Sequence, residues 1–337
     1  MKSRKVTNRD IAAAAGVSPT AVSFAMNGKD GISDETRRLI FDTARNMGYT
    51  PSLPNKSLNI ALLFRNDLYE FEQIFYTEMD SIIMDACRRL PYNLIMASVY
   101  HEGEKVLFSD ILYTARIDGM LVLGDPGADV LNAIHGLHIP FVILDSSRHD
   151  DNCCAVYVDY EMAAFQAACY LIDLGHRDIG YIGKNNISLQ DFTLLTFRGF
   201  QKATEKRNIA LATNRIQLDI TDEESLRRAV DRALEGSSMP TALFCCADYY
   251  AIFAIRHLHA RGLRVPEDIS VIGMDDVMIS RYLMPALTTV NVDKEKIVRL
   301  GLDLLISQIS GKKVSSVYIN EFEIKNRESV APPKNHS

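Results

Sequence analysis

A membrane-spanning helix needs about 20 consecutive apolar residues, and no apolar run in this chain of 337 residues approaches that length. It also lacks the apolar core of a signal peptide, and it contains no Cys-x-x-Cys pair. Its six cysteines are Cys87, Cys153, Cys154, Cys169, Cys245 and Cys246. We therefore expect a cytoplasmic protein with reduced, buried thiols, no bound metal and no contact with a membrane.

The short motifs of common enzymes are missing as well. The sequence contains no Gly-x-Ser-x-Gly, no phosphate-binding Gly-x-x-x-x-Gly-Lys and no metal-binding His-x-x-x-His. His257 and His259 are two residues apart, so on a helix they would face different sides. A sugar-modifying enzyme would need a base and a nucleophile that the sequence does not offer. We expect a protein that is not an enzyme and uses no cofactor.

What the sequence does contain is a helix-turn-helix pattern near its N-terminus. Thr7 and Asp10 form a Thr-x-x-Asp pattern that caps a first helix, and Gly16 can adopt the left-handed backbone that ends it. Ser18 then caps a second helix, with Pro19 at its first position. In a DNA-binding motif of this kind the second helix enters the major groove. The same pattern also fits a purely structural helical hairpin.

The distribution of charge favours DNA. Residues 1–57 carry nine Lys or Arg and five Asp or Glu, a net charge of +4. The whole chain carries −6, which leaves −10 for the remaining residues. A basic head attracts phosphate, whereas an acidic body does not.

The pattern changes after residue 58. Short apolar runs alternate with helical stretches, which indicates parallel sheets covered on both faces. Eleven runs exceed one comfortable sheet, so we expect two doubly wound subdomains with a ligand cleft between them. The expected strands are Asn59–Phe64, Asn93–Ser98, Gly119–Leu123, Phe141–Leu144, Ala155–Val158, Ile179–Ile182, Arg215–Leu218, Thr241–Cys246, Ser270–Met274, Thr289–Val292 and Val317–Glu323.

A series of short motifs extends over almost the whole chain. They are Val6–Ala12, Gly16–Ser18, Asn27–Gly28, Leu174–Gly183, Arg198–Phe200, Pro240–Cys245, Arg261–Asp276, Pro285–Thr289 and Arg327–Ser329. In order and spacing these motifs resemble the LacI/GalR family of transcriptional regulators. The resemblance implies an all-α helix-turn-helix head and an α/β body of two parallel-sheet subdomains, like periplasmic sugar-binding proteins.

The resemblance also implies a division of the chain. We expect the head at residues 1–49, a short linker at 50–58 and a tail at 332–337. Because the chain crosses between the subdomains three times, the N-terminal subdomain takes 59–160 and 291–318. The C-terminal subdomain takes 161–290 and 319–331.

The chain departs from the family pattern in three places. Phe24 and Ala21 stand in the second helix where members usually carry Arg and Thr, so base preference should differ, unless Phe24 only fills the core. The linker is about six residues shorter than usual, with Pro51 and Pro54, so we expect the hinge helix to be reduced or absent. Ala247 replaces an Asn that is frequent in sugar-binding members.

The expected DNA contacts lie in the head. Hydroxyl groups suit phosphate oxygens, and Thr20 and Ala21 are best placed to meet base edges. The predicted DNA-binding residues are Thr7, Ser18, Pro19, Thr20, Ala21, Ser23, Phe24, Asn27 and Lys29.

The expected effector contacts lie in the cleft. Asp275 directly follows an apolar strand, where a carboxylate can accept hydrogen bonds from hydroxyl groups, although it could also cap the next segment. The resemblance implies that Phe75, Tyr76, Asp159, Arg198 and Asp248 also line this cleft.

These inferences describe a homodimeric repressor that binds a double-stranded DNA operator and responds to a small effector. The effector would be a sugar, a sugar derivative or a nucleoside-like molecule. Tyr282–Pro285 would belong either to the dimer contact or to the core. The alternative is a periplasmic-type solute-binding protein without a regulatory role.

Overall fold

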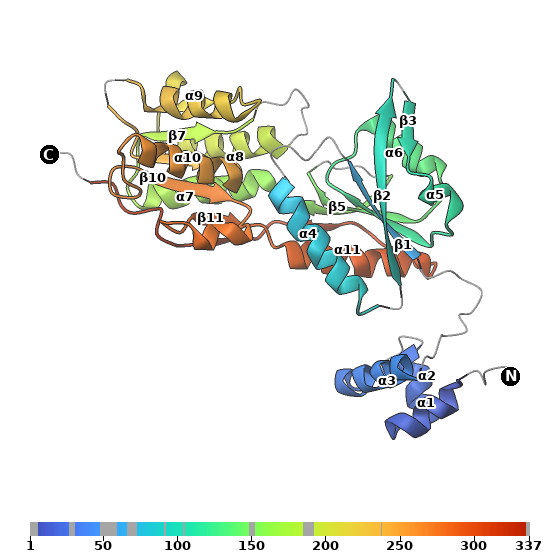
Figure 1. Ribbon diagram of the computed structural model, residues 1–337. Helices are drawn as coiled ribbons and strands as arrows, with labels where there is room; N and C mark the ends of the chain where they lie inside the picture. Colours follow the sequence, from blue (N-terminus) through green and yellow to red (C-terminus); the bar gives the residue numbers. More distant parts are fainter. Residues whose placement is uncertain are drawn as a thin grey trace.

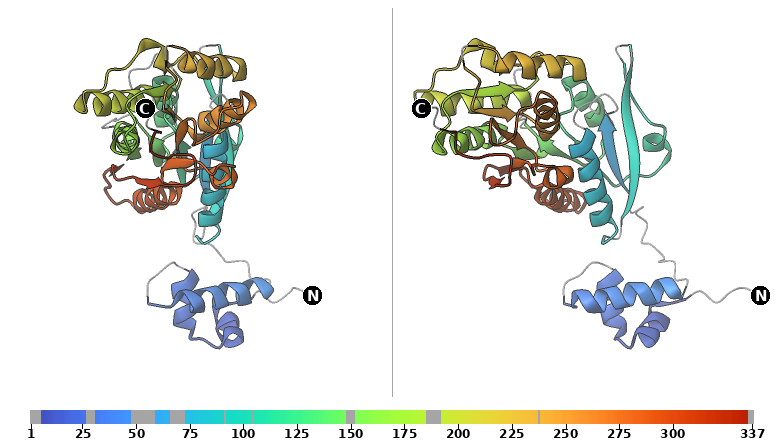
Figure 2. Two further views of the ribbon diagram at one scale, coloured as in Figure 1. Left: turned by 90° about the vertical axis from the view of Figure 1, so that its left-hand side faces the viewer. Right: turned by 60° about the vertical axis from the view of Figure 1, so that its left-hand side comes forward.

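The computed structural model describes residues 6–26, 31–47, 59–65, 73–90, 92–103, 105–147, 152–184, 192–236 and 238–334. A small helical head precedes a body of two α/β lobes (Figure 1). In the two further views of Figure 2 the head again forms a unit of its own beside the body. The linker and hinge segment at 50–58, together with Asn27 and Lys29, lies outside the described residues.

The head consists of α1 (Asn8–Ala15), α2 (Pro19–Met26) and α3 (Asp34–Asn46). The caps expected from the sequence are confirmed. Thr7 and Asp10 form a capping box, Gly16 ends α1 with a φ of 66°, and Ser18 Oγ accepts from the Ala21 amide at 3.0 Å. A small core of Ile11, Ala12, Val22, Ala25, Ile40 and Ala44 holds the three helices together.

The first lobe is built on a seven-stranded sheet with the order β12-β6-β5-β4-β1-β2-β3. Its helix α11 packs on α4, β4 and β5, so one face of the sheet is covered by a helix from late in the chain. The strands are β1 (Asn59–Arg65), β2 (Asn93–Glu102), β3 (Lys105–Phe108), β4 (Gly119–Leu123), β5 (Phe141–Ser146), β6 (Cys154–Val158) and β12 (Val317–Ile319); the helices are α4 (Gln73–Cys87), α5 (Ile111–Thr114), α6 (Ala128–Gly136) and α11 (Lys294–Ile309).

The second lobe is built on a six-stranded sheet with the order β13-β11-β10-β9-β7-β8. Its helices α7 and α8 pack tightly together, and α10 packs on β9 and β10. The strands are β7 (Ile179–Ile182), β8 (Ile216–Gln217), β9 (Ala242–Cys245), β10 (Ser270–Met274), β11 (Thr288–Asn291) and β13 (Glu323–Lys325); the helices are α7 (Tyr160–Asp173), α8 (Phe192–Lys206), α9 (Glu223–Leu234) and α10 (Asp248–Ala260), with the 3₁₀ helices η2 (Thr213–Arg215) and η3 (Met278–Tyr282).

Two details of the sheets correct the sequence expectation. The sheets are mixed, because the edge strands β3 and β13 run antiparallel to β2 and β11. The single strand expected at Val317–Glu323 is two strands, β12 in the first sheet and β13 in the second. The sequence pattern of residues 317–323 cannot reveal this division, because strand propensity does not indicate which sheet a strand joins.

The chain passes between the two sheets three times. It leaves the first sheet after β6, returns to the first lobe between β11 and α11, and crosses again between β12 and β13. β11 ends at Asn291 in the second sheet, and β12 ends at Ile319 in the first. The exact division into 59–160 with 291–318, and 161–290 with 319–331, stays a prediction.

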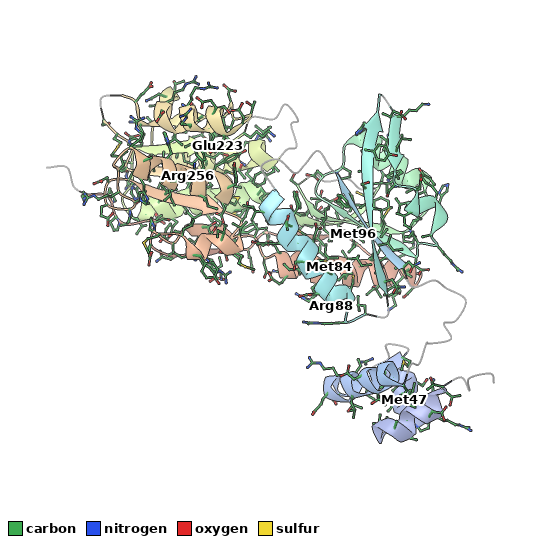
Figure 3. The ribbon with its side chains drawn as sticks, in the orientation of Figure 1. Met47, Met84, Arg88, Met96, Glu223 and Arg256 are labelled. Atoms are coloured by element: carbon green, nitrogen blue, oxygen red, sulfur yellow. The ribbon has the colours of Figure 1, made fainter. Side chains whose placement is uncertain are left out.

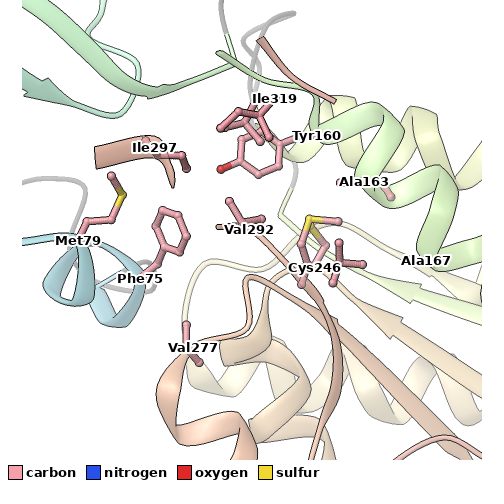
Figure 4. Close-up of a cluster of buried hydrophobic side chains, with 14 of the residues drawn as sticks. Phe75, Met79, Tyr160, Ala163, Ala167, Cys246, Val277, Val292, Ile297 and Ile319 are labelled. Atoms are coloured by element: carbon pink, nitrogen blue, oxygen red, sulfur yellow. The ribbon is translucent and has the colours of Figure 1, made fainter. Parts of the chain in front are cut away.

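One apolar cluster continues across both lobes. Phe75 and Met79 on α4 and Ile297 on α11 meet Tyr160 and Val277 of the second lobe, as Figure 4 shows. Burial of these side chains stabilises the contact between the lobes. Side chains at this junction between the lobes are therefore held in place by a packed apolar cluster.

The close contact of α7 and α8 depends on a missing side chain. A Cβ atom on Gly199 would lie 2.1 Å from the Glu161 carbonyl oxygen and 2.9 Å from the Phe165 amide nitrogen. Both neighbouring atoms belong to backbone, so they cannot move aside without displacing α7.

We expect Gly199→Ala to lower the free energy of unfolding of the body by about 2 kcal/mol or more, because it forces the two helices apart. Gly136→Ala in α6 is the matched control, since no atom lies within 4 Å of its added Cβ. That control should be neutral or stabilise by up to about 1 kcal/mol. Urea denaturation followed by circular dichroism measures both, and equal changes would contradict the packing argument.

Candidate functional sites

The start of α2 forms an exposed surface of small side chains. Ser18, Pro19 and Thr20 are all exposed, and α2 contains no charged residue. Thr7 is exposed as well, but its hydroxyl donates to the Asp10 carboxylate at 2.7 Å. The first turn of a helix presents unpaired backbone N–H groups, which suit phosphate oxygens.

The remaining predicted residues of α2 point partly inward. Ala21 packs against the head core, and Ser23 and Phe24 are half-buried. Phe24 does not belong to the core cluster; its ring lies 3.3 Å from the place that a Cβ of Gly31 would occupy. On α3, Arg37 donates to the Ala25 carbonyl at 3.3 Å, so this arginine also holds the end of α2.

A carboxylate shared by two tyrosines lies between the lobes. Asp145 stands at the end of β5 with a φ of 62°, and it is buried. Its carboxylate accepts from the Tyr76 hydroxyl at 3.2 Å and from the Tyr160 hydroxyl. Tyr76 comes from α4 of the first lobe, whereas Tyr160 begins α7 of the second. The three residues therefore join the lobes through one polar group.

Asp275 belongs to the same neighbourhood. Burial first, and then the charges of Asp145, Tyr76 and Asp275, raise the pKa of Tyr160 well above its usual value. Both carboxylates therefore lie close enough to act on one hydroxyl. Asp275 directly follows β10, and Val277 rather than Asp275 is the N-cap of η3. The alternative that Asp275 caps the next segment does not match the structure.

Aromatic rings border these polar groups. Phe75 is buried and meets Tyr76 edge-to-face, with 5.3 Å between ring centroids. Tyr160 meets Phe192 of α8 edge-to-face at 4.5 Å. The junction thus combines hydrogen-bond acceptors with apolar ring faces, the combination that recognises a molecule with hydroxyl groups and flat apolar faces.

Three predicted effector residues lie elsewhere. Arg198 is exposed on α8 and lines a surface depression of about 360 Å³ together with Glu161, Gln201, Lys202 and Glu205. Asp159 is exposed and caps α7 by accepting from the Met162 amide at 2.9 Å. The structure does not bring these two side chains to Asp145 and Tyr160.

Asp248 is fully buried inside the second lobe. Its carboxylate accepts from Ser280 Oγ at 2.7 Å, from the Val277 amide at 3.0 Å and from Thr289 Oγ1. Burial raises the pKa of Asp248 to about 7, although these hydrogen bonds act in the opposite direction. The geometry fits a structural role, because Asp248 ties η3 and β11 to the start of α10.

Sequence reasoning missed Asp145 and Tyr160. The signal for Asp145 was available, because it directly follows the apolar run Phe141–Leu144 as Asp275 follows Ser270–Met274. Tyr160 gave no such signal, because an aromatic residue at the start of a helix is ordinary without knowledge of its neighbours. The structure shows that both belong with Tyr76.

All six cysteines are free thiols, three of them buried and three half-buried. Among the residues that the structure describes, no group of His, Cys, Asp and Glu is arranged to hold a metal ion. No helix in the described ranges is both long and apolar enough to span a bilayer.

Comparison with known proteins agrees with this architecture. Residues 7–52 match the family described as bacterial regulatory proteins, lacI family, and residues 168–330 match the periplasmic binding protein-like domain. The transcriptional repressor PurR of Erwinia tasmaniensis is 32% identical over 341 residues, covering 96% of this chain and 97% of the relative.

Solved structures give the same result. A sugar-binding transcriptional regulator of the LacI family from Escherichia coli, complexed with phosphate, is 25% identical with a TM-score of 0.67, covering 83% of this chain and all of that structure. The regulator CelR in complex with cellobiose is 24% identical with a TM-score of 0.68, covering 96% of this chain and all of that one.

One carboxylate near the junction has an unsatisfied oxygen. Asp80 lies one turn after Tyr76 on α4, and within the described residues its Oδ1 is buried without a hydrogen-bond partner. Burial raises the pKa of Asp80 from 3.8 to about 6. The folded state therefore binds the carboxyl proton of Asp80 more tightly than the unfolded state does. The stability that this protonation contributes is present below pH 3.8 and is lost as the pH rises through about 6.

We expect Asp80→Asn to stabilise the protein at about pH 8 by about 1 kcal/mol, because the amide removes a poorly solvated charge from a half-exposed site. The gain should vanish at about pH 4, where Asp80 is protonated. Asp303→Asn, at an exposed carboxylate on α11 of the same lobe, should change stability little at either pH. Denaturation curves at both pH values measure the difference, and a gain that does not depend on pH would contradict this assignment.

Proposed function

Because the chain belongs to the LacI family of bacterial regulatory proteins, we propose that it represses transcription as a homodimer on a near-palindromic operator and that a small effector between the lobes controls this binding. The observation that carries the DNA-binding part is the exposed start of α2 on a basic head. A solute-binding protein without a regulatory role would have no use for such a head.

The composition of α2 points to the way bases are read. The helix reads Pro-Thr-Ala-Val-Ser-Phe-Ala-Met and has no Arg, Lys, Asn or Gln that could form a bidentate contact with a purine. The groups of α2 that remain to contact bases are hydroxyl groups, which can form hydrogen bonds, and apolar side chains, which can contact thymine methyl groups. We infer that Pro19, Thr20 and the exposed part of Phe24 read an operator half-site rich in A·T pairs.

We expect Thr20→Ala to weaken binding to a selected operator about 5- to 100-fold, because one base contact contributes about 1–3 kcal/mol. Thr43→Ala is the matched control on α3, where the threonine hydroxyl already donates to the Leu39 carbonyl at 2.8 Å. That control should leave operator affinity within about twofold. Fluorescence anisotropy with the operator and with a scrambled duplex measures both variants. Equal losses on the two duplexes would exclude Thr20 from base reading.

An exposed apolar surface supports the dimer. Ile74 and Met84 on α4 and Met96 on β2 are exposed in the first lobe, where Figure 3 labels the two methionines. In the second lobe a run of exposed apolar residues comprises Met278, Ile279, Tyr282 and Met284. The Met278 amide donates to Glu78 of α4 at 2.5 Å, so the second group begins at a contact with the helix that carries Ile74 and Met84. Tyr282 is 72% and Met284 90% exposed, which argues against core packing for both.

The effector part of the proposal is carried by the acceptors between the lobes. Asp145 accepts hydrogen bonds, Asp275 offers a second carboxylate that can accept them, Tyr76 and Tyr160 can accept or donate, and Phe75 offers an apolar face. We propose that these residues bind a neutral, hydroxyl-rich molecule such as a sugar or nucleoside. CelR, with its bound cellobiose, has the same fold. Two carboxylates disfavour a phosphorylated ligand.

We expect ribose, cellobiose or adenosine to raise the melting temperature of the wild-type protein in proportion to binding, and their phosphates to do so much less. Asp145→Asn should abolish the shift, and the control Asp303→Asn should retain it. Thermal shift assays measure the melting temperatures.

The variant Arg198→Ala distinguishes an effector bound between the lobes from one bound in the depression on α8. From the exposed position of Arg198 we expect the ligand-dependent shift to be retained in this variant. A shift that is lost in Arg198→Ala but kept in Asp145→Asn would place the effector in the depression on α8 instead of between the lobes.

A further inference from the structure

The ammonium group of Lys294 lies buried between the two lobes. Lys294 is the first residue of α11, which packs on α4 and the first sheet, and only 5% of it is exposed. Its Nζ donates to the backbone carbonyl oxygens of Asp275 at 2.7 Å and Asp276 at 3.2 Å. These two acceptors belong to the second lobe, at the end of β10. The contact therefore crosses the junction.

Glu78 completes the environment of this ammonium. Its Oε2 lies 3.5 Å from Lys294 Nζ, and the centroid of the Phe75 ring lies 5.0 Å from the same nitrogen. An ammonium group has three N–H donors, and three oxygens surround this one. A buried cation with a counter-charge and satisfied donors is stable where it lies, whereas loss of one partner is strongly unfavourable.

Glu78 also crosses the junction by itself. Its other oxygen, Oε1, accepts from the Met278 amide at 2.5 Å. Met278 is the first residue of η3, three residues after Asp275. Two side chains of the first lobe thus hold the backbone of one short segment of the second lobe, residues 275–278. Figure 4 shows Val277 of this segment below Phe75.

The backbone of Asp275 needs such support. Its φ is 115°, a conformation that residues other than glycine rarely adopt and that costs of order 1–3 kcal/mol. The Asp275 amide donates to the Val290 carbonyl at 2.9 Å within its own lobe, and its carbonyl oxygen accepts from Lys294 of the other lobe. When the lobes separate, the second of these contacts is lost, and the strained residue is free to relax.

We propose that Lys294, with Glu78 as its counter-charge, is a positioning residue that fixes the Asp275 carboxylate only when the lobes are closed. This inference rests on the proposed function for the role of Asp275 in effector binding; the tie between the lobes does not. Closure then creates the effector site, so the effector favours the closed state through its differential affinity for it. The same tie holds Met278, the first residue of the exposed apolar segment 278–284, so closure also sets the position of that surface.

The tie can be measured in the full-length protein without any ligand. Hydrogen–deuterium exchange reads the Met278 amide and its neighbours directly. We expect Lys294→Met to increase exchange in residues 275–284 about 10-fold or more, with β7 and β9 unchanged, because only the junction loosens. The matched control Arg299→Met removes an exposed cation from the same helix and should change nothing. Unchanged exchange in the segment, or an equal increase throughout the second lobe, would overturn the proposal.

Glu78→Gln provides a second variant in case Lys294→Met does not fold. The amide keeps the size of the side chain but removes the counter-charge, so exchange of the same segment should rise, by less than in Lys294→Met. Glu295→Gln, at an exposed glutamate next to Lys294, is its control. Identical exchange in Glu78→Gln and wild-type protein would remove Glu78 from the tie.

The positioning role is tested with ribose, cellobiose and adenosine as probes. For any probe that shifts the wild-type melting temperature, Lys294→Met should weaken apparent affinity about 10-fold, and Arg299→Met should not. A loosened segment with unchanged probe affinity would show that Lys294 does not position Asp275, which overturns the inference. If no probe binds the wild-type protein, the effector part of the proposed function fails, while the exchange experiment still decides whether the tie exists.

Discussion

The carboxylate of Asp145, bound by a tyrosine from each lobe, is the interaction on which the arrangement of the body depends. A buried carboxylate is unfavourable unless hydrogen bonds replace its water, and here the hydroxyl groups of Tyr76 and Tyr160 replace it. Both tyrosines are also buried, so their hydroxyl groups require the carboxylate as a hydrogen-bond acceptor. The lobes are therefore joined by hydrogen bonds between these buried polar groups, which lie inside an apolar cluster.

This construction makes the junction both stable and able to change. Apolar packing around Phe75, Met79 and Val277 is not directional, so it tolerates small rotations of one lobe against the other. The hydrogen bonds of Asp145 and Lys294 are directional and break abruptly when the lobes move apart. A molecule that satisfies the same acceptors can therefore bias the arrangement of the lobes, which is what a regulator controlled by a small ligand requires.

The head and the body divide the work by charge. The head is basic and exposes uncharged side chains at the start of α2, which supports the proposal that different residues attract phosphate and read bases. The body is acidic, and its central polar groups are carboxylates. Repulsion of phosphate by the body leaves the head as the part that meets DNA.

The position of Arg198, exposed on α8 rather than at the junction, shows that a sequence motif does not fix the direction of a side chain. On α8, Thr196 is fully buried with its hydroxyl 3.0 Å from that of Tyr181, whereas Arg198 is exposed. Residues two apart on a helix lie on nearly opposite faces, so the two side chains point in different directions. Nothing in the sequence marks which face α8 turns toward the junction until α7 is packed against it at Gly199.

The sequence by itself determined the head helices and most of the strands in their order, but not the edge strand β3. Capping residues, glycine turns and apolar runs act over a few positions, so the head helices, ten of the eleven expected strands and the place of Asp275 at a strand end could be predicted. Only the tertiary structure decided what meets between the lobes. Asp145, Tyr160 and Lys294 are distant in sequence, and their roles arise from burial and from partners on another lobe, which no local pattern encodes.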